Sequence, residues 1–145
     1  LSPRGKCFDQ SVAEALVEDP GVVLICGRFE GLDQRLIDAR KLEEISLGDY
    51  VLSGGEIASL AVLDTCVRLL PGVLGSKEGL EEESFTKGLL EYPLYTQPRE
   101  WEGKTVPEVL LSGHHGDIKT WQRQQAEMVT RDRRPDLWAR YREKS

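Results

Sequence analysis

Residues 22–31 read VVLICGRFEG, and this stretch decides the fold class. Its first five residues, Val22 to Cys26, form a continuous apolar and mostly β-branched run, which is typical of a strand buried on both faces of a parallel sheet. Such sheets are covered by helices. The apolar spacing predicts helices at 8–18, 33–39 and 57–70, and a second strand or extended segment at 44–51. The order of these elements predicts an α/β domain with a parallel sheet.

The pattern changes after residue 75. Residues 76–106 hold an acidic run and the stretch YPLYTQP, without a sustained period, which predicts a long connection. A helix is expected at 116–133, Pro135 ends it, and Asp136 can cap a last helix. We therefore expect three parts. They are an α/β part at 1–75, an interdomain linker at 76–106 and a small helical domain at 107–145.

The charge of the chain is unevenly distributed. The 145 residues carry a net charge of −6, which argues against a protein that coats nucleic acid non-specifically. From Asp117 to the end, however, there are 8 basic and 5 acidic residues. This excess of positive charge in the tail, from residue 117 to the end, has two possible explanations. The tail binds an anionic partner, or its helices simply expose charged faces to solvent.

Several classes of protein are disfavoured by what the sequence lacks. The 3 cysteines are far apart and the 2 histidines are adjacent, so neither a zinc spacing nor a disulfide framework is formed. We expect no metal site, and we expect the protein to reside in a reducing cytoplasm. No apolar run approaches the about 20 residues of a membrane helix. The chain starts at Leu1 inside the motif LSPRG, so we expect it to be a piece of a longer protein.

Three segments place glycine or proline where a strand should end: residues 1–5, 26–31 and 45–55. Glycine lets the backbone approach a ligand closely, and ligands of open α/β sheets lie beyond the carboxyl ends of the strands. The segments could therefore wrap a small molecule, or they could be three ordinary turns. The sequence has no G-x-G-x-x-G motif after a strand and no G-x-x-x-x-G-K-[ST] motif. Their absence disfavours a nucleotide held through its phosphates.

The motifs, taken in order, resemble a known family. LSPRG, LICGRFEGLDQR, EEISLGDYVLSGGE, PGVLG, EEESF, YPLYTQP and VPEVLLSGHH look like those of the bacterial tRNA (guanine-N1)-methyltransferases of the SPOUT class. The resemblance extends over nearly the whole chain. It implies a deep trefoil-knotted α/β domain whose first strands are missing here, then a linker and a helical tRNA-binding domain.

The same resemblance implies a cofactor and partners. The enzymes bind S-adenosylmethionine, form homodimers with active sites at the subunit interface, and methylate N1 of the guanine immediately 3′ of the anticodon in tRNA. By position, the expected methyl-donor pocket consists of Pro3, Gly5, Gly27, Phe29, Glu30, Ser46, Leu47, Gly48, Asp49, Tyr50, Val51, Leu52, Gly54 and Gly55. The product would be S-adenosylhomocysteine, and the need for a divalent ion stays open.

Methylation of guanine N1 requires a base and a cation. N1 is a poor nucleophile until its proton leaves, a carboxylate can accept that proton, and a cation beside O6 can stabilise the resulting charge. The resemblance places the catalytic carboxylate at Glu83 and the catalytic arginine at Arg68. Without the resemblance, the simplest interpretation of Arg68 is a long side chain that extends from an apolar helix into solvent. Glu83 would then be part of a solvated acidic run.

The sequence departs from the family at two of these motifs. Glu83 stands where the family usually has Asp, and Gln97 where it commonly has Arg. The extra methylene of Glu83 can displace the carboxylate by more than an ångström, and an error of that size can cost ~100-fold in rate. We therefore predict a tRNA guanine-N1 methyltransferase. The alternatives are a related methyltransferase acting on another RNA guanine, and an RNA-binding remnant without activity.

Overall fold

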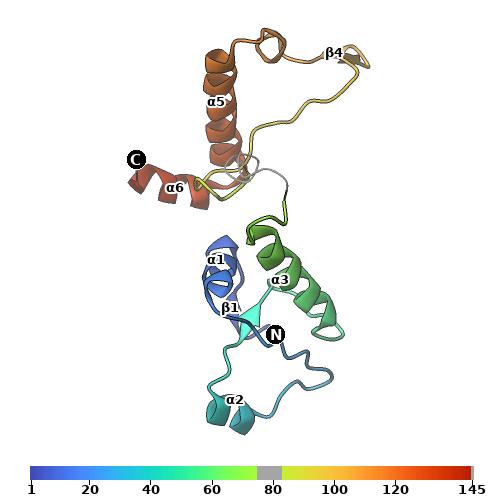
Figure 1. Cartoon of the computed structure of the whole chain (residues 1–145), viewed down its shortest axis with the longest axis vertical. Helices are drawn as coiled ribbons and strands as arrows, with labels where there is room; N and C mark the ends of the chain where they lie inside the picture. The colour runs from blue at the N-terminus through green and yellow to red at the C-terminus, as the bar shows by residue number, and fades with distance from the viewer. Residues whose placement is uncertain (75–82, 145) are drawn as a thin grey trace. The chain divides into compact units, whose positions relative to one another are not determined.

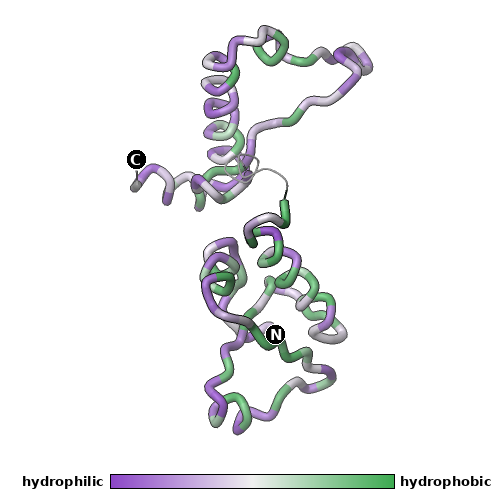
Figure 2. Tube along the Cα trace, in the orientation of Figure 1, coloured by the Kyte–Doolittle hydropathy of each residue, from purple (hydrophilic) through white to green (hydrophobic). Residues whose placement is uncertain are grey.

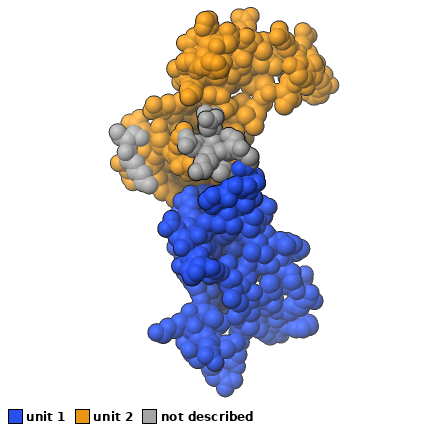
Figure 3. Space-filling view, in the orientation of Figure 1, with its two compact units in different colours: residues 1–75 blue, residues 76–145 orange. Residues whose placement is uncertain are grey.

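The computed structural model describes residues 1–74 and 83–144. It divides the chain into two units, residues 1–75 and 76–145 (Figure 3). Figure 1 shows the helices and strands along the chain. Residue 76, where the linker is predicted to begin, and the glutamates Glu78, Glu81 and Glu82 lie outside the described residues. No helix within the described ranges is both long and apolar enough to cross a membrane.

The first unit is built on one short pair of parallel strands. β1 (Lys6–Cys7) pairs with β2 (Ile45–Ser46), with Lys6 opposite Ile45 and Cys7 opposite Ser46. Its helices are α1 (Gln10–Glu18), α2 (Gln34–Arg40) and α3 (Glu56–Leu69). The predicted α/β class and parallel pairing are confirmed. The three helices of this unit lie within about two residues of their predicted bounds, a difference typical of helix ends.

The core of the first unit lies where α1 packs against α3. Ala13 of α1 and Val62 of α3 are fully buried there, and the small side chain of Ala13 lets the two helices approach closely. α1 begins at a cap, because the Asp9 carboxylate accepts a hydrogen bond from the Val12 N–H at 3.1 Å. The Ser11 hydroxyl and this N–H lower the pKa of the Asp9 carboxyl.

The predicted buried strand at Val22–Cys26 is wrong. The segment belongs to no strand, and Val23 is 88% exposed. A strand needs a neighbour that takes up its N–H and C=O groups along a ladder, and among the described residues no strand pairs with this segment. One bond, from the Leu1 amino group to the Ile25 carbonyl at 3.2 Å, is too little to form a ladder. Likewise, the segment predicted at 44–51 is a strand only at β2.

The second unit combines a hairpin with helices. Its elements are β3 (Glu100–Trp101), β4 (Lys104–Thr105), the short 3-10 helix η1 (Glu108–Leu111), α5 (His115–Arg133) and α6 (Pro135–Lys144). The two predicted helices are confirmed, whereas the antiparallel hairpin was not expected from the sequence. α6 starts at Pro135 itself, a position that suits proline, so Asp136 lies in the first turn instead of capping the helix.

A buried hydroxyl fastens the segment after Glu83 to α5. Thr130 is fully buried, and its hydroxyl donates to the Ala126 carbonyl at 2.6 Å and accepts from the Leu90 N–H at 2.8 Å. Within the segment, the Ser84 hydroxyl accepts from the Glu91 N–H at 2.9 Å. These bonds hold the turn that follows Glu83 against the helix.

Replacing Thr130 by Val keeps the shape of the side chain but leaves the part-buried Leu90 N–H without its acceptor. We expect the free energy of unfolding of the second unit to fall by about 1–3 kcal/mol, measured by urea denaturation. Thr120 is the matched control, since its exposed hydroxyl donates to the Gly116 carbonyl of the same helix at 2.9 Å. Thr120→Val should change stability by less than about 0.5 kcal/mol. Equal stability of the two variants would contradict the role of Thr130.

Candidate functional site

The first unit contains a cavity of about 510 Å³ formed by the three glycine- and proline-rich segments. All the residues predicted for the methyl-donor pocket line it except Gly5 and Asp49. Main-chain bonds bring the segments together, since the Ser2 N–H donates to the Ile45 carbonyl at 2.9 Å and the Gly55 N–H donates to the Gly27 carbonyl at 3.1 Å. The gathering of these segments thus depends on backbone contacts.

An ion pair ties the segment 26–31 to the start of α3. The Arg28 guanidinium donates to the Glu56 carboxylate, with Nε at 2.8 Å and Nη2 at 2.7 Å from Oε1. The Glu56 backbone N–H and the Arg28 guanidinium lower the pKa of the Glu56 carboxyl. Both side chains are largely exposed, so the pair adds little to global stability and acts mainly by fixing the position of the segment.

Close backbone contacts explain two of the glycines. A Cβ at Gly5 would collide with the backbone of Glu44 and Ile45, so Gly5 is needed for the approach of β1 to β2 and does not face the cavity. A Cβ at Gly55 would lie 2.8 Å from the Cys26 Cα. Gly27 differs, because a Cβ there would come no closer than 3.5 Å to the Gly31 Cα. A larger residue at Gly27 would therefore occupy the cavity without breaking the loop.

The chemistry of the lining suits a ligand with an apolar ring and polar groups. Apolar side chains such as Leu24, Ile25 and Val51 contribute to the wall. Among the charged residues of the lining, Glu44 accepts from Arg4 at 3.1 Å. A volume of a few hundred Å³ with apolar walls and a few polar groups is common for small-molecule sites. Among the described residues no three His, Cys, Asp or Glu side chains gather as metal ligands.

Glu83 lines a second cavity, of about 460 Å³, in the second unit. It is half-buried there, and the same cavity is bordered by the cations Lys87, Lys119 and Arg123. Arg123 Nε donates to the Glu127 carboxylate at 3.0 Å, so part of this positive charge is balanced within α5. The surroundings of Glu83 can thus hold an anionic or hydrogen-bonding substrate group beside a carboxylate.

Arg68 lies in the last turn of α3, in the first unit, and is half-buried. A cation near the carboxyl end of a helix interacts favourably with the helix dipole, which suits its position. The two predicted catalytic residues therefore belong to different units of the chain.

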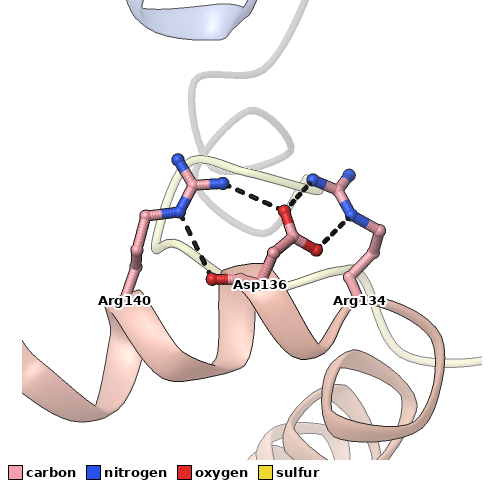
Figure 4. Close-up of polar contacts among 3 residues, drawn as sticks. All are labelled: Arg134, Asp136 and Arg140. Atoms are coloured by element: carbon pink, nitrogen blue, oxygen red, sulfur yellow. Dashed lines mark hydrogen bonds and ion pairs between the residues drawn. The ribbon is translucent and has the colours of Figure 1, made fainter.

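Part of the basic charge of the tail is balanced internally. Figure 4 shows Asp136 between two arginines: Arg134 donates to its two carboxylate oxygens at 2.8 and 2.6 Å, and Arg140 Nη2 donates to one of them at 3.2 Å. The guanidinium of Arg134 holds the pKa of the Asp136 carboxyl well below its usual range. Arg131 contacts Asp132 at 3.5 Å, and Arg133 is exposed.

The aromatic residues of α5 and α6, Trp121, Trp138 and Tyr141, are half-buried. The rings of Trp138 and Tyr141 stack with centroids 5.7 Å apart, and the Arg142 guanidinium lies 6.0 Å from the Trp138 ring centroid. Trp121 contacts Tyr95 with centroids 6.2 Å apart. The aromatic residue that sequence reasoning missed is Trp101, on the hairpin, which is 60% exposed. The Glu102-Gly103 turn was the available signal for this hairpin.

The family model described as tRNA (Guanine-1)-methyltransferase TrmD matches residues 1–140. A tRNA (guanine-N(1)-)-methyltransferase of Nitrobacter winogradskyi is 60% identical over 139 residues, which are 96% of this chain and 58% of the relative. Relatives of the same name from Rhodospirillum rubrum and Bartonella tribocorum are each 58% identical over 141 residues, or 97% of this chain and 59% and 61% of theirs.

The chain therefore spans about three-fifths of the length of these curated relatives. The family match covers both units, including the segments that line the first cavity and the segment that carries Glu83. The chain belongs to the tRNA (Guanine-1)-methyltransferase TrmD family.

Proposed function

We propose that the full-length protein containing this chain transfers a methyl group from S-adenosylmethionine to N1 of the guanine 3′ adjacent to the anticodon in tRNA. The observation that carries this proposal is the first cavity, because the three segments singled out by sequence surround one space of ligand size. Family membership supports the reaction type. The names of the relatives support guanine N1 of tRNA as the acceptor.

The residues of the first cavity fit the proposed cofactor. Backbone groups of the segments 26–31 and 45–55 and apolar side chains such as Leu24 suit an adenine ring, while the carboxylate of Glu30 suits the positive sulfonium and amino groups. S-adenosylmethionine supplies the methyl group and leaves as S-adenosylhomocysteine, whose sulfur keeps the electron pair of the broken bond. The role of the chain is to hold it in a fixed position beside the guanine.

Glu83 and Arg68 are the proposed catalytic residues. The Glu83 carboxylate accepts the proton of guanine N1 and frees the lone pair that attacks the methyl group. The Arg68 guanidinium donates to O6 and stabilises the negative charge that develops on the ring. Glu83 stands where the family usually has Asp, and the turn fastened by Thr130 follows it directly in the chain.

The remaining parts of the proposal concern assembly. We propose a trefoil-knotted domain, a linker at 76–106 and a tRNA-binding domain at 107–145, joined in a homodimer whose sites use Glu83 of one chain with the cavity of the other. The resemblance to the family supports this arrangement, as does the location of Glu83 and Arg68 in different units. A tRNA substrate and three free thiols fit a cytoplasmic protein.

Gly27→Val should weaken cofactor binding. The valine fills space inside the cavity, and overfilling a packed site costs about 1–3 kcal/mol, or roughly ten- to hundredfold in the Kd of S-adenosylmethionine. Isothermal titration calorimetry measures the Kd. Gly21→Val is the matched control, because a Cβ at Gly21 meets nothing within 4 Å and Gly21 does not line the cavity. Unchanged affinity of a folded Gly27→Val protein would show that the cofactor binds elsewhere.

Glu83→Gln should abolish most turnover while cofactor affinity stays near that of the parent. The amide keeps size and hydrogen bonding but cannot accept the N1 proton, so the single-turnover rate should fall by about 100-fold or more. Glu83→Asp should retain or raise the rate. Glu91, which borders the same cavity, is the control, and Glu91→Gln should behave like the parent. Parent-like rates of Glu83→Gln at neutral pH would remove Glu83 from the mechanism.

Mixed dimers test whether two chains form each site. A Glu83→Gln chain retains a sound cofactor cavity, and a Gly27→Val chain retains a sound carboxylate. If Glu83 serves the cavity of the partner, heterodimers of the two should recover methylation in one of their two sites, assayed by methyl incorporation into tRNA. Purified heterodimers no more active than either parent variant would indicate that each site is built within one chain.

A further inference from the structure

The hairpin formed by β3 and β4 has a defined turn. Its two strands pair with Glu100 opposite Thr105 and Trp101 opposite Lys104, so Glu102 and Gly103 are the two loop residues. Both have positive φ, 49° and 73°, as a type I′ turn requires. This turn matches the twist of the strands, so the hairpin holds its side chains in a fixed order.

Alternation along the strands sorts the charges of the hairpin by face. Paired residues lie on the same face and successive residues on opposite faces. Trp101 therefore shares a face with Lys104. The next pair on that face is Arg99 and Val106, joined by a bond from the Val106 N–H to the Arg99 carbonyl at 2.9 Å. Glu100 lies on the other face, so one side of the hairpin presents an indole between two cations.

This face has no partner within the part of the chain that the structure describes. Trp101 is 60% exposed, and no helix or further strand in the described ranges contacts β3 or β4. Neither Arg99 nor Lys104 forms an ion pair there. The tip of the hairpin is hydrophilic in Figure 2, which does not suit burial against an apolar protein surface.

We propose that this face of the hairpin binds unpaired nucleotides of the RNA substrate, with the Trp101 indole stacked on a base and Arg99 and Lys104 on the adjoining phosphates. The inference rests on the proposed function, because it takes tRNA as the substrate. Stacking of single-stranded bases on aromatic rings between cations is a common basis of RNA binding. Charge complementarity favours RNA, since Arg99 and Lys104 share the face of Trp101 while Glu100 lies on the other face.

The experiment measures binding of RNA to the full-length gene product by fluorescence anisotropy, with an anticodon stem-loop and a fully paired duplex as probes. Trp101→Ala should weaken stem-loop binding by about tenfold or more, because stacking contributes about that much per base. Trp101→Phe should retain most of the affinity, since it keeps a ring. Glu100→Gln, on the opposite face, is the matched control and should behave like the parent. Replacing Arg99 and Lys104 together should flatten the salt dependence of binding.

Three results would overturn the inference: parent-like stem-loop affinity of Trp101→Ala, an equal loss with the paired duplex, or a change in oligomeric state with RNA affinity intact. The last result would assign the face to a protein partner. A failure of the proposed function can be told apart from a failure of this inference, because the parent protein would then transfer no methyl group. Binding of the stem-loop through Trp101 can be measured whether or not a methyl group is transferred.

Discussion

The hydroxyl of Thr130 is the interaction on which the second unit depends most directly. It is fully buried in α5, where it donates to the Ala126 carbonyl and accepts from the Leu90 N–H. A part-buried N–H that loses its acceptor is costly, so this bond favours the observed position of the chain after Glu83 on the helix. Glu83 directly precedes this anchored turn. The position of the proposed base therefore depends on Thr130, which has no proposed role in the reaction itself.

The first unit fixes its cavity by a different means. Its segments are joined by main-chain bonds, from Ser2 to Ile45 and from Gly55 to Gly27, and by the approach of Gly55 to the Cys26 backbone. A cavity shaped by backbone suits recognition of a small molecule through N–H and C=O groups. The close approach of Gly55 to Cys26 also explains why a side chain is not tolerated at that position.

The sequence predicted the helices well and the strands poorly, for a physical reason. Helices are specified by local signals, such as the Asp9 cap of α1 and Pro135 at the start of α6. A strand needs a distant partner, which local sequence does not show. The apolar composition of Val22–Cys26 is typical of a strand, yet the segment forms none. The cavity segments were identifiable from glycine spacing and the family motifs. Thr130 was not, because its importance arises only when Leu90 packs beside it.

The distribution of ion pairs determines where RNA would find free cations. Net basic charge in the tail suggests an RNA surface, yet Arg134 and Arg140 converge on Asp136, and Arg123 binds Glu127. Exposed ion pairs of this kind contribute about 0–1 kcal/mol, so a phosphate can replace the carboxylate. The net gain is small, because the arginine loses its bond to the carboxylate when it binds the phosphate. In the proposed function, these paired arginines would contribute mainly a diffuse attraction, which salt screens. The hairpin differs, because Arg99 and Lys104 lie on one face beside the exposed Trp101 ring, and the proposed contacts to unpaired bases fit that face.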